Sequence, residues 1–160
     1  GHGKEAAEAS FIAVNALNNI VSPEDPVALV KQCHQALKGS RGVVLSMAVF
    51  DAGAGSMTWL GIGNVEGVLK RGNGTKETLF LFQGILGYNV PSVRPWTIPV
   101  SEGDTVVLAT DGVRRGFSED INPFDPPVRI ARMIMEKHIR KTDDALVLAA
   151  RYLGGRQDDV

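Results

Sequence analysis

Apolar residues in the first third of the chain are spaced as on one face of a helix. Between positions 4 and 20 they recur every three or four residues, at Ala7, Phe11, Val14 and Leu17, the spacing typical of an amphipathic helix. The segment 23–26, Pro-Glu-Asp-Pro, interrupts this pattern and begins a second predicted helix that runs to about Leu37. Turn-forming residues follow at 38–42.

Beyond that loop the period changes from helical to strand-like. Six β-rich apolar runs predict strands, most of them separated by glycine-containing turns, over Val43–Phe50, Met57–Gly63, Val65–Lys70, Glu77–Phe82, Val93–Pro99 and Thr105–Thr110. The turn at 51–55 is typical of a hairpin. A third helix is predicted over 126–139, whereas 145–153 is compatible with a strand or a helix.

This order of elements predicts an α+β fold, in which helices pack on antiparallel sheets. The chain has 160 residues, which suits one domain with a sizeable core. No internal repeat, linker or low-complexity segment divides it. We therefore expect residues 1–160 to form a single domain.

Composition narrows the possible partners. The net charge is −1 and the pI is about 6.3, so no basic field favours nucleic acid or an anionic membrane. No apolar run approaches the roughly 18 residues of a membrane span, and the chain opens without the basic region of a signal peptide. The single cysteine, Cys33, follows a helical apolar pattern and is expected in the core. A cytoplasmic monomer is the expectation.

Asp111 is the leading candidate for chemistry. It follows the apolar run 105–109 and precedes Gly112, as in a buried strand that delivers a carboxylate to the end of a sheet. Burying a charge is costly unless a partner compensates it, so this position suggests a cation. Gly112 would allow a sharp turn or a close approach of the backbone. The alternative is an aspartate that caps the loop after the strand.

Two acidic pairs lie further along, Asp143–Asp144 and Asp158–Asp159. Adjacent carboxylates before an apolar strand suit Mg²⁺ or Mn²⁺, which prefer oxygen ligands. The alternative for the first pair is the N-cap of a helix over 145–153, and for the second a solvated polar tail.

The N-terminal glycines, a glycine-containing turn and two histidines are weaker candidates for a functional role. The opening Gly1-His2-Gly3 could place an anion at a helix N-terminus or be a flexible end. The segment 61–64, Gly-Ile-Gly-Asn, is a turn after a strand, and His34 and His138 are expected to be structural or exposed. No Gly-x-Ser-x-Gly, P-loop or Cys-x-x-Cys motif occurs, which argues against serine hydrolases, P-loop NTPases and thiol redox enzymes.

Taken in order, these motifs resemble those of the metal-dependent (PPM, type 2C-like) serine/threonine phosphatases, in the bacterial SpoIIE branch. The matching segments are Gly1–Ala7, Gly61–Asn64, Ala109–Gly112 and Asp143–Ala145. The resemblance spans nearly the whole chain. The single helix between Asp111 and Asp143 is most similar to the small stressosome phosphatases of this branch.

The resemblance implies a two-sheet antiparallel sandwich flanked by helices, with two Mn²⁺ or Mg²⁺ ions at one end of the sheets. It implies in-line hydrolysis of phosphoserine or phosphothreonine by metal-activated water, with Asp111 and Asp143 as catalytic metal ligands. Asp144 would lie beside them at the metal site, where it orients the site or holds water. Implied substrates are phosphorylated stressosome proteins with STAS domains.

The chain also departs from the family pattern. The first family motif begins with an Asp-Gly pair that would lie just before Gly1, so the expectation is an N-terminally incomplete copy that lacks the opening strands. The alternative is a non-catalytic, phosphoprotein-binding regulator on the same scaffold. The sequence Asp158-Asp159-Val160 also matches the last family motif, and Asp143 is preferred because 145–152 resembles the closing strand.

Overall fold

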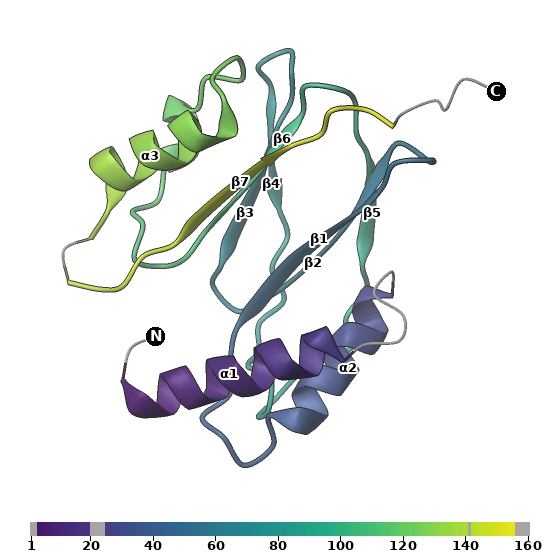
Figure 1. The fold of residues 1–160 in the computed structure, drawn as a ribbon, viewed down its shortest axis with the longest axis vertical. Coiled ribbons are helices and arrows are strands. Elements are labelled where there is room, and N and C mark those ends of the chain that lie inside the picture. Colours follow the sequence, from purple (N-terminus) through teal and green to yellow (C-terminus); the bar gives the residue numbers. More distant parts are fainter. Residues whose placement is uncertain (1–2, 20–24, 141, 156–160) are drawn as a thin grey trace.

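Two antiparallel sheets stacked face to face form the centre of the molecule (Figure 1). The computed structural model describes residues 3–19, 25–140 and 142–155. The first sheet has the order β1-β2-β5, with strands Leu45–Asp51, Ser56–Ile62 and Trp96–Pro99. The second has the order β4-β3-β6-β7, with strands Lys76–Leu79, Glu66–Lys70, Thr105–Ala109 and Val147–Arg151.

Helices cover the outer face of each sheet. Helices α1 (Lys4–Asn18) and α2 (Pro26–Ala36) lie on the first sheet, and α3 (Pro127–His138) lies on the second (Figure 1). A short 3₁₀ turn, η1 (Phe117–Asp120), precedes α3. Among the described residues, no helix combines the length and the apolar character needed to cross a bilayer.

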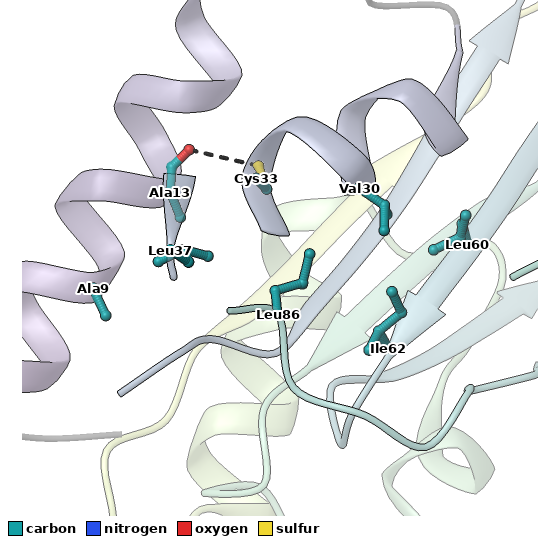
Figure 2. Packing of buried hydrophobic residues seen from close by; sticks show 8 residues of the cluster. All are labelled: Ala9, Ala13, Val30, Cys33, Leu37, Leu60, Ile62 and Leu86. Carbon is teal, nitrogen blue, oxygen red and sulfur yellow. Dashed lines mark hydrogen bonds between the residues drawn. The ribbon is translucent and has the colours of Figure 1, made fainter. Parts of the chain in front are cut away.

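The helical layer is held by small and branched apolar side chains. Ala9 and Ala13 of α1 meet Val30 and Cys33 of α2, and this group packs on Ile62 of β2 (Figure 2). The thiol of Cys33 lies 4.0 Å from the carbonyl oxygen of Ala13, and burial raises its pKa. The prediction that Cys33 belongs to the core is confirmed.

A tryptophan fixes the contact between the two sheets. The ring of Trp59 on β2 crosses to Gly67 on β3, where a Cβ would lie only 2.3 Å from Cη2. The indole Nε1–H donates a 2.7 Å hydrogen bond to the carbonyl oxygen of Phe80, just beyond β4. The indole therefore fills the space left by a glycine, and its one polar atom is satisfied.

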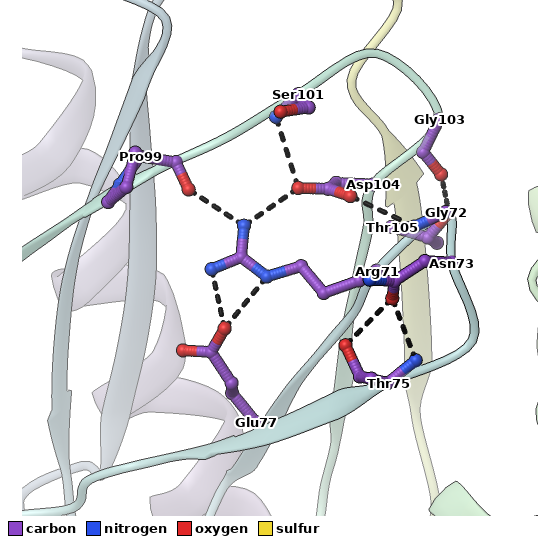
Figure 3. Close-up of polar contacts among 10 residues, drawn as sticks. All are labelled: Arg71, Gly72, Asn73, Thr75, Glu77, Pro99, Ser101, Gly103, Asp104 and Thr105. Carbon is purple, nitrogen blue, oxygen red and sulfur yellow. Dashed lines mark hydrogen bonds and ion pairs between the residues drawn. The ribbon is translucent and has the colours of Figure 1, made fainter.

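A buried carboxylate joins two turns at one end of the second sheet (Figure 3). Asp104 is 4% exposed and accepts hydrogen bonds from Arg71 Nη1 at 2.8 Å and from the backbone N–H groups of Gly72 and Ser101 at 3.0 and 3.1 Å. Arg71 also pairs with Glu77 at 2.5 Å. Burial alone would raise the pKa of Asp104, but these hydrogen bonds outweigh it and lower the pKa.

The predicted fold class is confirmed. The differences concern element bounds and the buried face of the first helix, where Phe11 and Val14 are exposed because α1 packs on α2 through its small residues Ala9 and Ala13. The fourth predicted strand ends at Leu79, because Phe82 instead forms an isolated bridge with Ile62 of the other sheet. The ambiguous segment 145–153 contains a strand, β7, whose residues pair with β6 from Val147↔Ala109 to Arg151↔Thr105. The helix alternative for this segment is wrong, because a continuous antiparallel ladder satisfies its backbone.

Candidate functional site

Asp111 lies where β6 ends, at the opposite end of that strand from Asp104. Its Oδ2 accepts a 2.8 Å hydrogen bond from Nδ2 of Asn64, in the turn between β2 and β3. The side chain is exposed, which corrects the expectation of a buried charge. The need for a compensating cation therefore does not follow from burial, because water reaches this carboxylate.

The segment before β7 runs directly beside Asp111. Thr110 N–H donates to the carbonyl oxygen of Leu146 at 3.1 Å, and Leu146 N–H donates to Thr110 Oγ1 at 2.9 Å. A Cβ at Gly112 would lie 2.1 Å from the carbonyl oxygen of Asp144. The close approach predicted at Gly112 is therefore made to the protein's own backbone, and it brings the Asp143–Asp144 pair to the same sheet end as Asp111.

The two adjacent aspartates interact with each other. Asp144 N–H donates a 2.9 Å hydrogen bond to Asp143 Oδ1, and both residues are exposed. A side-chain hydrogen bond with Asp143 lowers the pKa of the Asp144 carboxyl. This end of the sheet thus gathers three exposed carboxylates, those of Asp111, Asp143 and Asp144.

The carboxylates at this sheet end are the type of ligand that a divalent cation prefers, but the described residues provide too few of them. Carboxylate oxygens suit Mg²⁺ and Mn²⁺, yet the described residues contain no group of three or more His, Cys, Asp or Glu side chains that could hold a metal ion. The residues in these segments therefore do not make a complete metal shell. The predictions for Gly1, His2, Asp158 and Asp159 lie outside the described residues.

The two remaining histidines have structural partners. His34 Nδ1 accepts a 3.0 Å hydrogen bond from the backbone N–H of Gly87. His138 Nε2 lies 3.0 Å from Asp120 Oδ2, a hydrogen bond that lowers the pKa of Asp120. The prediction that these histidines are structural or exposed is confirmed.

A cleft begins beside Asn64. It has a volume of about 1050 Å³ and is lined by the β2–β3 turn, the end of β4, the loop 83–89 and Arg115. Sequence reasoning singled out the turn at 61–64 but found neither the bond from Asn64 to Asp111 nor this cleft. Both join segments far apart in the chain, and no local pattern marks either of them.

Comparison with known proteins settles the family. The model of the Stage II sporulation protein E (SpoIIE) family matches residues 1–160. The chain belongs to the SpoIIE family. The resemblance seen in the sequence motifs is thereby confirmed.

One curated relative is also similar to this chain. The phosphoserine phosphatase RsbX of Bacillus subtilis (strain 168) is 26% identical over 113 residues, which are 71% of this chain and 56% of RsbX. The chain thus matches little more than half the length of that curated relative.

Solved structures agree on the fold. One solved structure is described under the bacterial stressosome, a modular system that has been adapted to control secondary messenger signaling. Its chain is 30% identical to this one with a TM-score of 0.81, over 94% of this chain and 80% of that chain. RsbX in complex with magnesium is 21% identical with a TM-score of 0.79, over 93% of this chain and 74% of the other. The predicted PPM-type sandwich is therefore confirmed, because phosphatase structures of this type superpose on nearly the whole chain.

Proposed function

We propose that this SpoIIE-family chain is part of a metal-dependent protein phosphatase that hydrolyses phosphoserine or phosphothreonine on signalling proteins. The family match over residues 1–160 carries the proposal. Support comes from the relative RsbX, named a phosphoserine phosphatase. The position of Asp111 beside the segment that carries Asp143 and Asp144 adds a structural reason.

Asp111, Asp143 and Asp144 are the residues we assign to the site. Asp111 and Asp143 would contribute oxygen ligands to Mn²⁺ or Mg²⁺, and Asp144 would orient them. Bound metal would lower the pKa of a water molecule and stabilise charge on the phosphoryl oxygens. Asn64 would orient the Asp111 carboxylate through its 2.8 Å hydrogen bond. The described residues supply only part of such a ligand set.

The proposed substrates are phosphorylated stressosome proteins with STAS domains. The reason for this choice is that a solved relative at 30% identity is described with the bacterial stressosome.

The test is phosphate release by the full-length protein from a phosphoserine protein with and without Mn²⁺. Asp111→Asn is expected to lower kcat by at least about 100-fold, because a neutral amide is a poor ligand for a hard cation. Glu136→Gln is the matched control, since it removes one exposed carboxylate from α3 and should leave activity unchanged. Full activity of Asp111→Asn would refute the assignment.

A second function is favoured by one observation, the absence of a three-residue ligand group from the described segments. On this alternative the chain is a non-catalytic regulator that binds a phosphoprotein. It predicts binding that is insensitive to chelator and no phosphate release by the full-length protein under any metal condition.

A further inference from the structure

Asn64 links the cleft to the candidate catalytic position. Asn64 is one of the residues that line the cleft, and its side-chain N–H donates a hydrogen bond to the carboxylate of Asp111. If a phosphoryl group is held near Asp111, the polypeptide attached to it would therefore extend along this cleft. Its volume of about 1050 Å³ lies at the upper end of small-molecule sites and is far larger than a phosphoryl group needs.

One cation faces this space. Arg115 is the only lysine or arginine among the described lining residues, and it lies four positions beyond Asp111 in the chain. Within the described segments Arg115 makes no hydrogen bond or ion pair. Its planar guanidinium is therefore available for the bidentate recognition of phosphate oxygens. Glu66 is the only acid in the lining, so attraction of a phosphate would be local to Arg115.

The cleft wall also presents apolar side chains to solvent. Tyr88 is 77% exposed and Phe80 is 61% exposed, and both line the cleft together with Ile85. The ring of Phe80 packs edge-on against Phe82, with centroids 5.0 Å apart. Exposed aromatic residues grouped in a concavity are typical anchors for a bound chain.

This wall is held in place by its own backbone. The loop closes on itself through Ile85 N–H to Asn89 O at 2.9 Å, and Leu86 exchanges two hydrogen bonds with Val43. Gly87 N–H donates to His34 Nδ1 at 3.0 Å. The loop that carries Tyr88 is thus anchored both to Val43, just before β1, and to α2. A preorganised wall loses little conformational entropy when a ligand binds.

We propose that this cleft binds the polypeptide segment that flanks the phosphorylated residue, with Arg115 contacting the phosphoryl group and Tyr88 and Phe80 receiving an apolar side chain of that segment. The proposal rests on the proposed function and deepens it. It makes these three residues determinants of substrate specificity: the preferred phosphosite has an apolar neighbour.

Binding can be measured separately from turnover. The full-length protein is titrated, with chelator present to stop hydrolysis, into fluorescent phosphoserine peptides of about nine residues, and anisotropy is recorded. One peptide has leucine at every second position around the phosphoserine, a second has alanine there, and unphosphorylated copies of both complete the set. Thermal melts confirm that each variant is folded.

Tyr88→Ala and Phe80→Ala are each expected to weaken binding of the leucine peptide by about fivefold and to change the alanine peptide little. Arg115→Gln should weaken both phosphorylated peptides by about tenfold and leave the unphosphorylated ones unchanged. The matched controls are Phe124→Ala and Arg132→Gln, which change exposed residues that do not line the cleft.

Two results would overturn the proposal. One is an unchanged leucine preference in both aromatic variants, and the other is an equal effect of Arg115→Gln on phosphorylated and unphosphorylated peptides. Failure of the proposed function has a different signature, namely no phosphate release from any peptide when Mn²⁺ replaces the chelator. The binding comparison would then still decide the role of the cleft.

Discussion

Replacing Asp104 by asparagine is expected to cost about 3 kcal/mol of unfolding free energy. The carboxylate accepts three hydrogen bonds, from Arg71 Nη1 and from the backbone N–H groups of Gly72 and Ser101. A hydrogen bond to a charged group contributes about 1.5–3 kcal/mol and a neutral one about 0.5–1.5 kcal/mol. Asparagine has a single acceptor oxygen, whereas Oδ1 of Asp104 accepts the Gly72 bond and Oδ2 accepts the other two. At least one buried N–H donor would therefore face an NH₂ group and lose its partner, at a cost of about 1–3 kcal/mol, and the bonds that remain lose the charge of the acceptor. Asparagine keeps the volume, so no cavity forms.

The measurement is urea unfolding at neutral pH, followed by circular dichroism, for the wild type and Asp104→Asn. The midpoint should fall while the slope m stays unchanged, because the same surface is exposed on unfolding. The melting temperature should fall by about 6–12 °C. The control is Asp51→Asn at the end of β1. Asp51 is exposed and accepts a single hydrogen bond, from Ala54 N–H at 2.9 Å, so its replacement should cost less than about 1 kcal/mol.

The pH dependence provides a second check on the role of Asp104. Its pKa is lowered in the folded protein, so its contribution is fully present above the unfolded value of about 3.9 and is lost as the pH falls through the folded pKa. The stabilities of the wild type and the variant should therefore converge in acid. A difference below about 0.5 kcal/mol at neutral pH, or one that persists unchanged into strong acid, would refute the reasoning.

Three further predictions concern other contacts. Gly67→Ala should destabilise by about 1–3 kcal/mol, because its Cβ would lie 2.3 Å from the Trp59 ring; a chemical melt within error of wild type would contradict this. Asn64→Ala should lower phosphatase kcat/KM by about tenfold, because the orienting bond to Asp111 is lost, while stability changes by less than about 0.5 kcal/mol at this exposed site. Asp25→Ala should cost about 1 kcal/mol in thermal unfolding, since its side chain caps two N–H groups of α2; an unchanged melting temperature would rule that out.

Periodicity predicted the elements of this fold well because most of them bury one face. The strands around β2 and β6 carry apolar residues that the structure places in the core. The helix over 4–20 also forms, but the apolar stripe that predicted it is not its buried face: Phe11 and Val14 are exposed, and α1 buries Ala6, Ala9 and Ala13 instead. The segment 145–153 could not be assigned in this way. Its strand conformation depends on hydrogen bonds to β6, which lies nearly forty residues earlier.

The candidate site was only partly predictable. Asp111 could be singled out because it follows a strand, but its exposure depends on which loops cover the sheet end. Its partner Asn64 lies 47 residues away, and Asp104 reaches Arg71 across 33 residues. Such pairs leave no periodic signal, because both contacts are created by the pairing of β3 with β6 and not by local spacing.

The contact between Trp59 and Gly67 links the evolution of the two positions. Any side chain at 67 requires a smaller residue at 59, and a smaller residue at 59 no longer reaches the carbonyl oxygen of Phe80, which belongs to the cleft wall. A first substitution at either position therefore produces a less stable protein whose cleft wall has lost its support from the core. Descendants of this chain are expected to keep or exchange the two residues together, and to vary the surface of the cleft much more freely than the tryptophan behind it.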